Sequence, residues 1–314
     1  MRHWKRKLCG WVSMAAMAIF VLLFNINTPI RTHFSQKGSR LLKSDDSVVA
    51  IEFPYNNQTE RSDHKVPDVP FDVCKNAHFA NPHTYPLIAL TGVPGSGNTW
   101  TRYLLERASG FYTGSVYLDK KLFEGGFKGE YARYTSGKTI IVKTHDMGSS
   151  STTSLFEGAV LIVRNPYDTL LSYANLVSAG HTGWASRQYF FSSDWDAFVE
   201  SASIAWEDRI ITWVTRKNVM VVYFERLQSH LRQEIVRILQ FLNVPIDDHR
   251  IDCTVAHPEG NFHRKKEERN RTFDPYTNKH KAIIDMHVKS TSKVLRENGY
   301  LDGDLPYSGL SKLV

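Results

Sequence analysis

A glycine-rich stretch is the first place in this sequence where residue types and spacing suit chemistry. Residues 92–100 are Gly-Val-Pro-Gly-Ser-Gly-Asn-Thr-Trp and follow the apolar run 87–91. This pattern predicts a buried strand, a tight turn and a helix that begins near Asn98. The N–H groups at a helix N-terminus bind anions, because they have no intrahelical partner and the helix dipole adds positive potential. The stretch therefore predicts an anion-binding loop.

A nucleotide-binding P-loop is the first alternative for this stretch. Gly92 and Gly97 have the spacing of the two glycines in the GxxxxGK[ST] loop, but Asn98 stands at the position of its lysine. A nucleotide kinase or NTPase that depends on lysine and magnesium is therefore the less favoured hypothesis.

Two further predicted strands also end in polar side chains. Residues 138–145 form a mainly apolar run that ends in Lys143 and His145, and residues 159–164 end in Arg164. Neutral imidazole can accept a proton near pH 7, so His145 suits the role of general base. Arg164 suits a phosphate ligand, because guanidinium presents a planar set of donors.

These groups must be positioned by the elements around them, and the pattern is one of strands alternating with helices. We expect strands at 87–91, 138–145, 159–164 and 219–224, and helices from Asn98, from Pro166 with Asn165 as its cap, and at 194–217, 226–242 and 278–298. Such alternation predicts a parallel sheet with helices on both faces and ligands at the carboxyl ends of the strands. The expected fold class is α/β, a P-loop-like three-layer fold.

Five motifs in this order resemble those of the PAPS-dependent sulfotransferases. Residues 94–100 are similar to the 5′-phosphosulfate loop, and residues 143–145 to the Lys-Thr-His segment that carries the base. Residues 163–172, 224–227 and 262–265 resemble the 3′-phosphate motif, the Tyr-Glu-Asp-Leu motif and a late Phe-x-Arg-Lys phosphate clamp. The resemblance covers roughly residues 87–307. It implies PAPS as the co-substrate, released as PAP, and no requirement for a metal ion.

The resemblance also implies a role for each matching residue. His145 is the expected general base, with Glu124, Glu130 and Asp146 as alternatives, because some Golgi members use a carboxylate. Trp100 is expected to stack on adenine. The expected ligands of the donor are Gly95, Ser96, Gly97, Asn98 and Thr99 at its 5′-phosphosulfate, and Arg164, Ser172, Arg264 and Lys265 at its 3′-phosphate.

Gly95 is the main departure from the family pattern. Many relatives have lysine or arginine there, placed on the bridging oxygen of the leaving group. We expect Lys143 to supply the missing cation, with Arg102 as the second choice. Phe224 and Arg226 also replace residues of the Tyr-Glu-Asp-Leu motif. Gly95 keeps open a third hypothesis, a non-catalytic protein that binds PAPS or a glycan.

One subgroup of the family is especially similar. Residues 92–100, 110–115, 126–130 and 259–262 resemble the sulfotransferase domain of the WSC-domain-containing sialate O-sulfotransferases, and three cysteines are too few for the WSC modules. The resemblance implies a glycan acceptor, with sialic acid first. The formal net charge of +7 suits an anionic ligand, an anionic glycan or a nucleic acid. Given the resemblance, we expect no nucleic-acid partner.

An aromatic cluster follows the predicted helix that begins at Pro166. One interpretation is that its rings line an acceptor cleft, because sugars stack on aromatic faces. The other is that they form a hydrophobic patch that packs a loop onto the core. The cluster consists of Trp184, Tyr189, Phe190, Phe191 and Trp195.

The N-terminal region predicts membrane targeting. A basic tail at 1–7 precedes an uncharged apolar segment, which we interpret as a signal-anchor helix at 8–27, with a cleaved signal peptide as the alternative. A polar stem at 28–84 then leads to a sulfotransferase domain at 85–314. This order predicts a single-pass type II membrane protein with a lumenal domain, and the resemblance implies that the membrane is that of the Golgi.

Two features of the sequence fit a lumenal chain. Asn57 and Asn270 lie in sequons and are candidates for N-glycosylation. Cys74 and Cys253 either pair in a disulfide or remain as buried thiols, and an oxidising compartment favours the pair.

Overall fold

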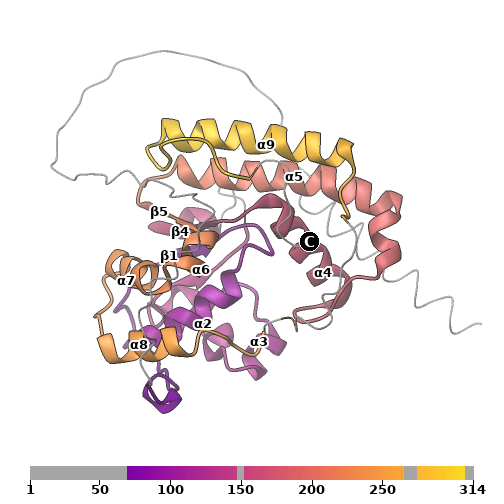
Figure 1. Cartoon of the computed structure of the whole chain (residues 1–314). Coiled ribbons are helices and arrows are strands. Elements are labelled where there is room, and N and C mark those ends of the chain that lie inside the picture. The colour runs from indigo at the N-terminus through magenta and orange to yellow at the C-terminus, as the bar shows by residue number, and fades with distance from the viewer. Residues whose placement is uncertain (1–68, 147–151, 263, 265–273, 308–314) are drawn as a thin grey trace, which may run out of the picture. The chain divides into compact units, whose positions relative to one another are not determined.

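The computed structural model describes residues 69–146, 152–262, 264 and 274–307 (Figure 1). The predicted signal anchor at 8–27, most of the predicted stem, both sequons and Lys265 lie outside these residues. Within the described ranges, no helix combines the length and the apolar character needed to cross a bilayer.

A parallel sheet forms the centre of the fold, and it confirms the predicted α/β class. Among the described residues it has five strands in the order β2-β3-β1-β4-β5, and every neighbouring pair is parallel. The strands are β1 (Ile88–Thr91), β2 (Gly114–Ser115), β3 (Val142–Lys143), β4 (Gly158–Val163) and β5 (Val219–Tyr223). β3 is shorter than the predicted run 138–145. β2 was not predicted, because a strand of two residues is too short to show a hydrophobic periodicity.

The helices follow the predicted order with three differences. They are α2 (Asn98–Ser109), α3 (Lys120–Glu124), α4 (Pro166–Ala179), α5 (Ser193–Val214), α6 (Phe224–Ser229), α7 (Leu231–Phe241), α8 (Asp248–Ala256) and α9 (Asn278–Glu297). The predicted helix 226–242 is instead two helices, α6 and α7, because His230 leaves the helical conformation between them. α3 and α8 were not predicted. The side chain of Asn165 caps α4 as expected, since it accepts a hydrogen bond of 3.0 Å from the backbone of Tyr167.

Two hydrophobic cores cover the two faces of the sheet. Successive strand residues point to opposite faces, so Ala89 joins the core that contains Trp206 of α5. Leu90 joins the core that contains Leu104 of α2. α5 and α9 run side by side over one face, and α2, α7 and α8 pack together over the other (Figure 1). The arrangement is the predicted three-layer fold.

The carboxyl ends of the strands carry the residues that the sequence singles out. β1 leads into the loop 92–97 and then into α2, β3 ends two residues before His145, and β4 ends at the residue before Arg164. β5 leads directly into Phe224. Because parallel strands end at one edge of the sheet, the fold brings these groups together there.

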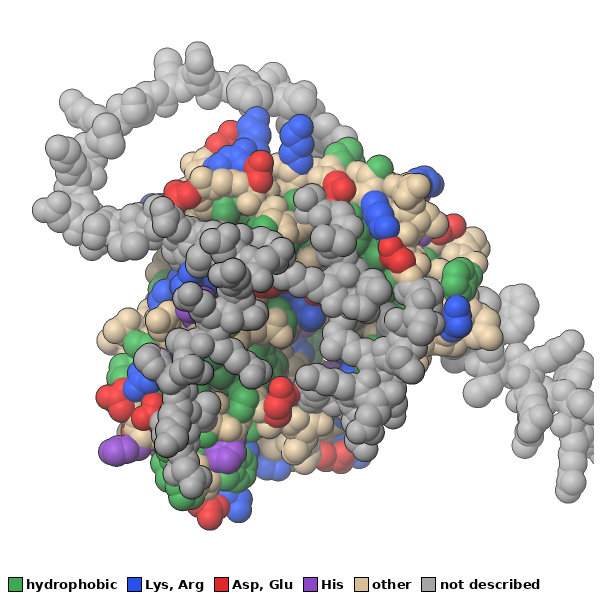
Figure 2. All heavy atoms as spheres, viewed as in Figure 1, with side chains coloured by type: hydrophobic (Ala, Val, Ile, Leu, Met, Phe, Trp, Pro, Cys, Tyr) green, Lys and Arg blue, Asp and Glu red, His purple; other side chains and the backbone are tan. Residues whose placement is uncertain are grey.

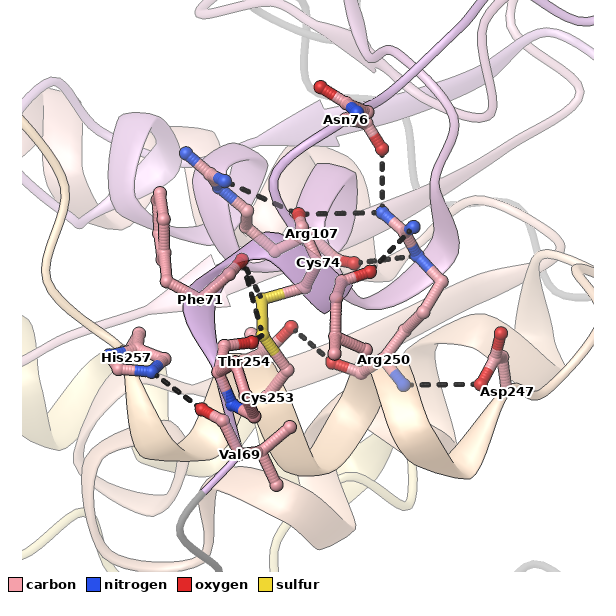
Figure 3. The surroundings of a disulfide bond; sticks show 12 residues. Val69, Phe71, Cys74, Asn76, Arg107, Asp247, Arg250, Cys253, Thr254 and His257 are labelled. Carbon is pink, nitrogen blue, oxygen red and sulfur yellow. Dashed lines mark hydrogen bonds between the residues drawn. A yellow bond between two sulfur atoms is a disulfide. The ribbon is translucent and has the colours of Figure 1, made fainter.

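Residues upstream of the predicted boundary at 85 pack on the folded part of the chain. His78 forms a parallel bridge with Phe111. A disulfide joins Cys74 to Cys253 of α8, with Cα atoms 5.8 Å apart (Figure 3). The structure therefore confirms the disulfide over the alternative of two free thiols, and the packed region extends at least to Val69.

Candidate active site

A cavity of about 570 Å³ is lined by residues from the carboxyl edge of the sheet. The space-filling view shows Lys and Arg side chains inside the hollow on this face (Figure 2). Of the first-choice site residues within the described ranges, all but Ser96 line it, and Ser96, itself part of the loop 92–97, is buried. Those that line it are Gly95, Gly97, Asn98, Thr99, Trp100, Lys143, His145, Arg164, Ser172 and Arg264.

The N-terminus of α2 lies at the cavity, where the glycines predict an anion site. Gly97 is the N-cap, at φ +105°, and no side chain caps the helix there. The first N–H groups of a helix have no intrahelical partner. The amide of Ser96 is already used, since it donates to the carbonyl of Val93 at 2.9 Å. Among the described residues, the Asn98 side-chain oxygen has no hydrogen-bond partner, although Asn98 is only 4% exposed and lines the cavity.

The surroundings of Gly95 explain why no lysine or arginine stands there. Its φ is +95°, a conformation that L side chains rarely adopt. A Cβ atom would lie 2.6 Å from the carbonyl oxygen of Thr169 and 2.9 Å from the backbone nitrogen of Tyr173, both in α4. Arg164 Nη1 donates to the Gly95 carbonyl at 2.8 Å. The loop thus lies directly against α4, and this contact requires glycine.

His145 has the geometry of a general base. Its Nδ1 lies 2.8 Å from the carbonyl oxygen of Gly92 and 3.3 Å from the side-chain nitrogen of Asn98. A carbonyl only accepts, so Nδ1 carries the proton and Nε2 keeps its lone pair. The ring also stacks on Tyr117, whose hydroxyl accepts the His145 backbone N–H at 2.5 Å.

The electrostatic surroundings keep His145 neutral. Burial lowers the pKa of His145 well below its ordinary value, and the Lys143 cation acts in the same direction, while the Gly92 carbonyl opposes both. A neutral imidazole at pH 7 is the protonation state that a base requires.

Lys143 is the cation that the sequence predicts in place of a basic residue at 95. It lines the cavity although it is only 7% exposed. Burial lowers the pKa of Lys143 to about 8, with a further contribution from Arg102, while Glu130 and Asp119 oppose the shift. It therefore remains largely protonated at pH 7.

Arg102, the second choice for this cation, is used elsewhere. It is fully buried, it forms an ion pair with Glu130, and its Nε donates to the Thr113 hydroxyl at 2.7 Å. It does not line the cavity. The expectation that Arg102 serves the leaving group is therefore not supported by its position.

The three carboxylates that were alternatives to His145 also lie outside the cavity lining. Glu130 is fully buried in its ion pair with Arg102, and its second oxygen accepts the backbone N–H of Asp119 at 3.0 Å. The Glu124 side chain is 61% exposed and pairs with Lys120. Asp146 follows His145 but does not reach the cavity. Of the four candidates, only His145 does.

A second polar cluster contains the residues expected at the 3′-phosphate. Arg264 Nη1 donates to the Ser172 hydroxyl at 3.3 Å, and its Nε donates to the carbonyl of Gly183 at 2.9 Å. The structure thus brings together two predicted residues that are 92 positions apart. Arg164 lines the same cavity, with its guanidinium 4.2 Å from the centre of the Phe224 ring.

Trp100 and Phe224 form the aromatic part of the lining. Their ring centres lie 5.5 Å apart, edge to face, and Trp100 Nε1 donates to the carbonyl of Pro258 at 2.8 Å. Phe224 also packs against the loop, because a Cβ atom at Gly97 would lie 2.5 Å from its ring. The replacement of tyrosine by Phe224 therefore keeps an aromatic wall beside the loop.

The downstream aromatic cluster mainly serves packing. Phe190 and Trp195 belong to the hydrophobic core and are 4% and 1% exposed. Phe191 is 68% exposed and does not line the cavity. Only Trp184 of this cluster reaches it. The packing interpretation holds for the core members of the cluster.

Sequence reasoning missed several residues of the cavity wall. Asp168 and Asn175 line it from α4, beside Ser172. Their spacing from Ser172, four and three residues, places all three on one helical face, and this periodicity was a usable signal. His181 also lines the cavity and pairs with Asp119, its Nε2 lying 2.9 Å from Oδ2. No local pattern marks His181.

Comparisons with known proteins identify a family for this chain. The family model described as the sulfotransferase domain matches residues 65–290. WSCD family member GA21586 of Drosophila pseudoobscura pseudoobscura is 37% identical over 203 residues, 63% of this chain and 63% of the relative. WSCD family member AAEL009094 of Aedes aegypti is 35% identical over 215 residues, 67% of this chain and 66% of the relative. The matched region thus covers just under two thirds of the length of these relatives.

Several solved structures resemble this chain in part. Mouse sulfotransferase SULT7A1 complexed with PAP has a TM-score of 0.46 at 16% identity, over 71% of this chain and 88% of that one. Retinol dehydratase in a complex with retinol and PAP has a TM-score of 0.40 at 16% identity, and the match covers 73% of this chain and 86% of that one. The match to the family model extends over most of the sequence, and this chain belongs to the sulfotransferase domain family.

Proposed function

We propose that this protein transfers a sulfuryl group from PAPS to a hydroxyl group of a glycan. One observation carries the proposal. A single cavity combines a helix N-terminus, the cations Lys143, Arg164 and Arg264, and a neutral histidine whose Nε2 can accept a proton. Membership of the sulfotransferase domain family supports the same reaction.

The residues of the cavity fit PAPS, which has anionic groups at two ends. The N-terminus of α2 and Lys143 suit the phosphosulfate, and the cluster of Arg264, Ser172 and Arg164 suits the 3′-phosphate. Trp100 offers an aromatic surface for adenine. The Asn98 side-chain oxygen, buried without a partner among the described residues, can accept a hydrogen bond only from an N–H or O–H group of a ligand and does not itself suit the phosphosulfate. The volume of about 570 Å³ is in the range of small-molecule sites.

The chain's own groups perform the proton transfer and the stabilisation of charge. PAPS, when bound, supplies the sulfuryl group and a phosphate leaving group. His145 Nε2 takes the proton of the acceptor hydroxyl, and the Gly92 carbonyl holds the ring in the required tautomer. Lys143 and the α2 N-terminus stabilise the negative charge that develops on the leaving phosphate. Gly95 itself contributes no charge.

We propose sialic acid as the leading acceptor and the Golgi lumen as the location. Three observations support this. The sequence resembles the WSC-domain-containing sialate O-sulfotransferases, and relatives at 35–37% identity are named WSCD family members. The disulfide Cys74–Cys253 suits an oxidising compartment. The apolar segment at 8–27 suits a signal anchor.

The test uses the full chain, produced through a secretory pathway, with sulfate-labelled PAPS. Sialylated, asialo and uronic-acid glycans are offered as acceptors, beside ATP with magnesium as an alternative ligand. Label on sialylated glycans alone supports the full proposal, and label on another glycan retains the reaction but removes the sialate assignment. Binding of PAP without transfer to any acceptor favours the non-catalytic alternative. Magnesium-dependent binding of ATP in place of PAP favours a kinase or NTPase.

A further inference from the structure

A short segment ahead of the first strand forms part of the cavity wall. We call residues 71–77 the strap. Four of its residues, Phe71, Lys75, Asn76 and Ala77, line the same cavity as the loop 92–97 and His145. The sequence gives no sign of this, because the strap lies in the region predicted as stem.

The strap is fastened at several points (Figure 3). The disulfide ties Cys74 to Cys253 of α8. Arg250, also in α8, donates to strap carbonyls, at 3.2 Å to Val73, 3.4 Å to Cys74 and 2.8 Å to Asn76. The same guanidinium donates to the carbonyl of Arg107 at 3.0 Å and so joins the strap to the end of α2.

α2 carries a second contact to the strap. Arg107 Nη1 donates to the carbonyl of Cys74 at 3.3 Å. Its guanidinium lies 4.4 Å from the centre of the Phe71 ring and 5.0 Å from that of Tyr103. Backbone carbonyls of the strap thus accept hydrogen bonds from Arg107 and Arg250. Its side chains at 75–77 contribute to the cavity.

The strap lies near the opposite end of α2 from the reacting groups. The reacting end of the cavity is at the start of α2, where Asn98 contacts His145. Arg107, against the strap, is nine residues further along the helix, which is about 13 Å at 1.5 Å per residue. Trp100, proposed for adenine, lies between these two ends of α2, about one helical turn before Tyr103. We call the part of the cavity beyond Trp100 the strap end, and it contains none of the residues assigned to the two phosphate groups of PAPS.

The strap end carries groups suited to a sugar chain. Phe71, Tyr103 and Tyr112 provide aromatic surface, Asn76 provides an amide that both donates and accepts, and Lys75 provides a cation. Lys75 forms an exposed ion pair with Asp72, its Nζ lying 3.7 Å from Oδ1, and because its side chain is 59% exposed it can turn to a ligand. Aromatic faces pack on the apolar faces of sugar rings, amides bind hydroxyl groups, and an ammonium group binds a carboxylate.

We propose that the strap end binds the part of the acceptor glycan beyond the sugar that receives sulfate, with Lys75 and Asn76 as its polar contacts. This inference rests on the proposed function. Because of the strap, the protein prefers an extended glycan to a single sugar. The Cys74–Cys253 disulfide and Arg250 hold the strap in position.

The test compares a sialylated trisaccharide with a methyl sialoside, and a uronic-acid pair of the same two lengths. Binding to the PAP-loaded full chain is measured by NMR, which requires no turnover. We expect the wild type to bind the longer member of a pair at least about tenfold more tightly. The double variant Lys75→Ala/Asn76→Ala loses this advantage, while PAP affinity is unchanged. Lys289→Ala/Ser290→Ala, an exposed pair on α9, is the matched control.

The outcomes separate the inference from the proposed function. The inference is overturned if the wild type binds long and short glycans equally. It is also overturned if the double variant keeps the preference for the longer glycan, or if the wild type binds no glycan. The length preference without sulfuryl transfer counts against the proposed function alone. Transfer with equal KM for both lengths counts against the strap alone.

A second variant tests the positioning role of the disulfide. In Cys74→Ser/Cys253→Ser, we expect the length preference to fall towards that of the double variant, with PAP affinity retained. Near-ultraviolet circular dichroism confirms that the core is still packed. A retained preference would show that the disulfide does not position the strap. If this variant does not fold, Arg250→Lys is used in its place, because it keeps the charge and removes the fork of donors.

Discussion

Nδ1 of His145 lies 2.8 Å from the carbonyl oxygen of Gly92, the first residue of the anion-binding loop. The contact links the end of β3 to the end of β1, 53 positions apart. One hydrogen bond thus fixes the tautomer of the proposed base and its place beside the helix N-terminus that would hold the donor.

His145→Ala should remove the base and leave the donor site. We expect the rate of sulfuryl transfer to fall by about 10²–10⁴-fold, with PAP affinity changed by less than about threefold. Label transfer and calorimetry measure the two quantities. His249→Ala, an exposed histidine, is the control and should keep full activity. A variant that transfers label at the wild-type rate would remove His145 from the mechanism.

The pH profile should have its alkaline limb near pH 8. Transfer requires neutral His145, whose pKa is well below its ordinary value, so the rate should not decline between pH 7 and 6.5. It also requires protonated Lys143, whose pKa is about 8, so the rate should fall as pH rises through that value. Lys143→Arg should move this limb upwards, because guanidinium remains protonated. If Lys143→Met keeps the same limb, another group is responsible.

The same pKa shift predicts a change in stability with pH. The folded-state pKa of Lys143 is below the unfolded value of 10.5. The unfolded chain therefore binds more protons between pH 8 and 10.5, and the contribution of Lys143 to the free energy of unfolding rises across that window. Chemical denaturation should show this rise in the wild type relative to Lys143→Met. Parallel curves for the two proteins would contradict it.

Restoring a side chain at position 95 should destabilise the protein rather than improve catalysis. Gly95→Ala places a Cβ atom 2.6 Å from the Thr169 carbonyl oxygen, and we expect a loss of about 2–4 kcal/mol in the free energy of unfolding from strain and overpacking. Gly299→Ala is the control, because Gly299 has φ +75° but nothing within 4 Å of an added Cβ. It should cost about 1 kcal/mol. Equal losses in thermal or denaturant unfolding would show that the contact with α4 is unimportant.

Arg264 should recognise the 3′-phosphate. PAP and adenosine 5′-monophosphate differ by this group, so the wild type should prefer PAP, and Arg264→Ala should lose about 1.5–3 kcal/mol of that preference, roughly ten- to hundredfold in Kd. Ser172→Ala should lose less, since its hydroxyl is uncharged. Calorimetry with both nucleotides measures the difference, and Arg187→Ala, exposed and outside the cavity lining, is the control. An unchanged PAP preference in Arg264→Ala would refute the assignment.

Substitution of Glu130 or Glu124, two of the carboxylates considered as alternative bases, should not remove a catalytic group. Only the Glu130 substitution should lower the stability. Glu130→Ala leaves Arg102 buried without its partner, which costs about 3–5 kcal/mol. Glu124→Ala should change stability by less than about 0.5 kcal/mol and leave the transfer rate unaltered, because its exposed ion pair is weak. Denaturant unfolding and label transfer test both. A folded Glu124→Ala protein without activity would reopen the question of the base.

The sequence determined the local parts of this protein. The strand, loop and helix at 88–109 follow from a short apolar run, glycines and a helical pattern, all of which act between neighbours in the chain. The same holds for the capped start of α4 at Asn165. The positions of His145 and Arg164 at strand ends also followed, because parallel strands share one edge.

Only the tertiary structure decided which residues meet across long distances in the chain. The choice of His145 over Glu130 depended on the burial of Glu130 against Arg102, and the reason for Gly95 is the backbone of α4 more than 70 positions away. The strap joined the cavity through a disulfide that spans 179 positions. Such contacts depend on how layers pack, and a local pattern of residues contains no record of packing partners that are distant in the chain.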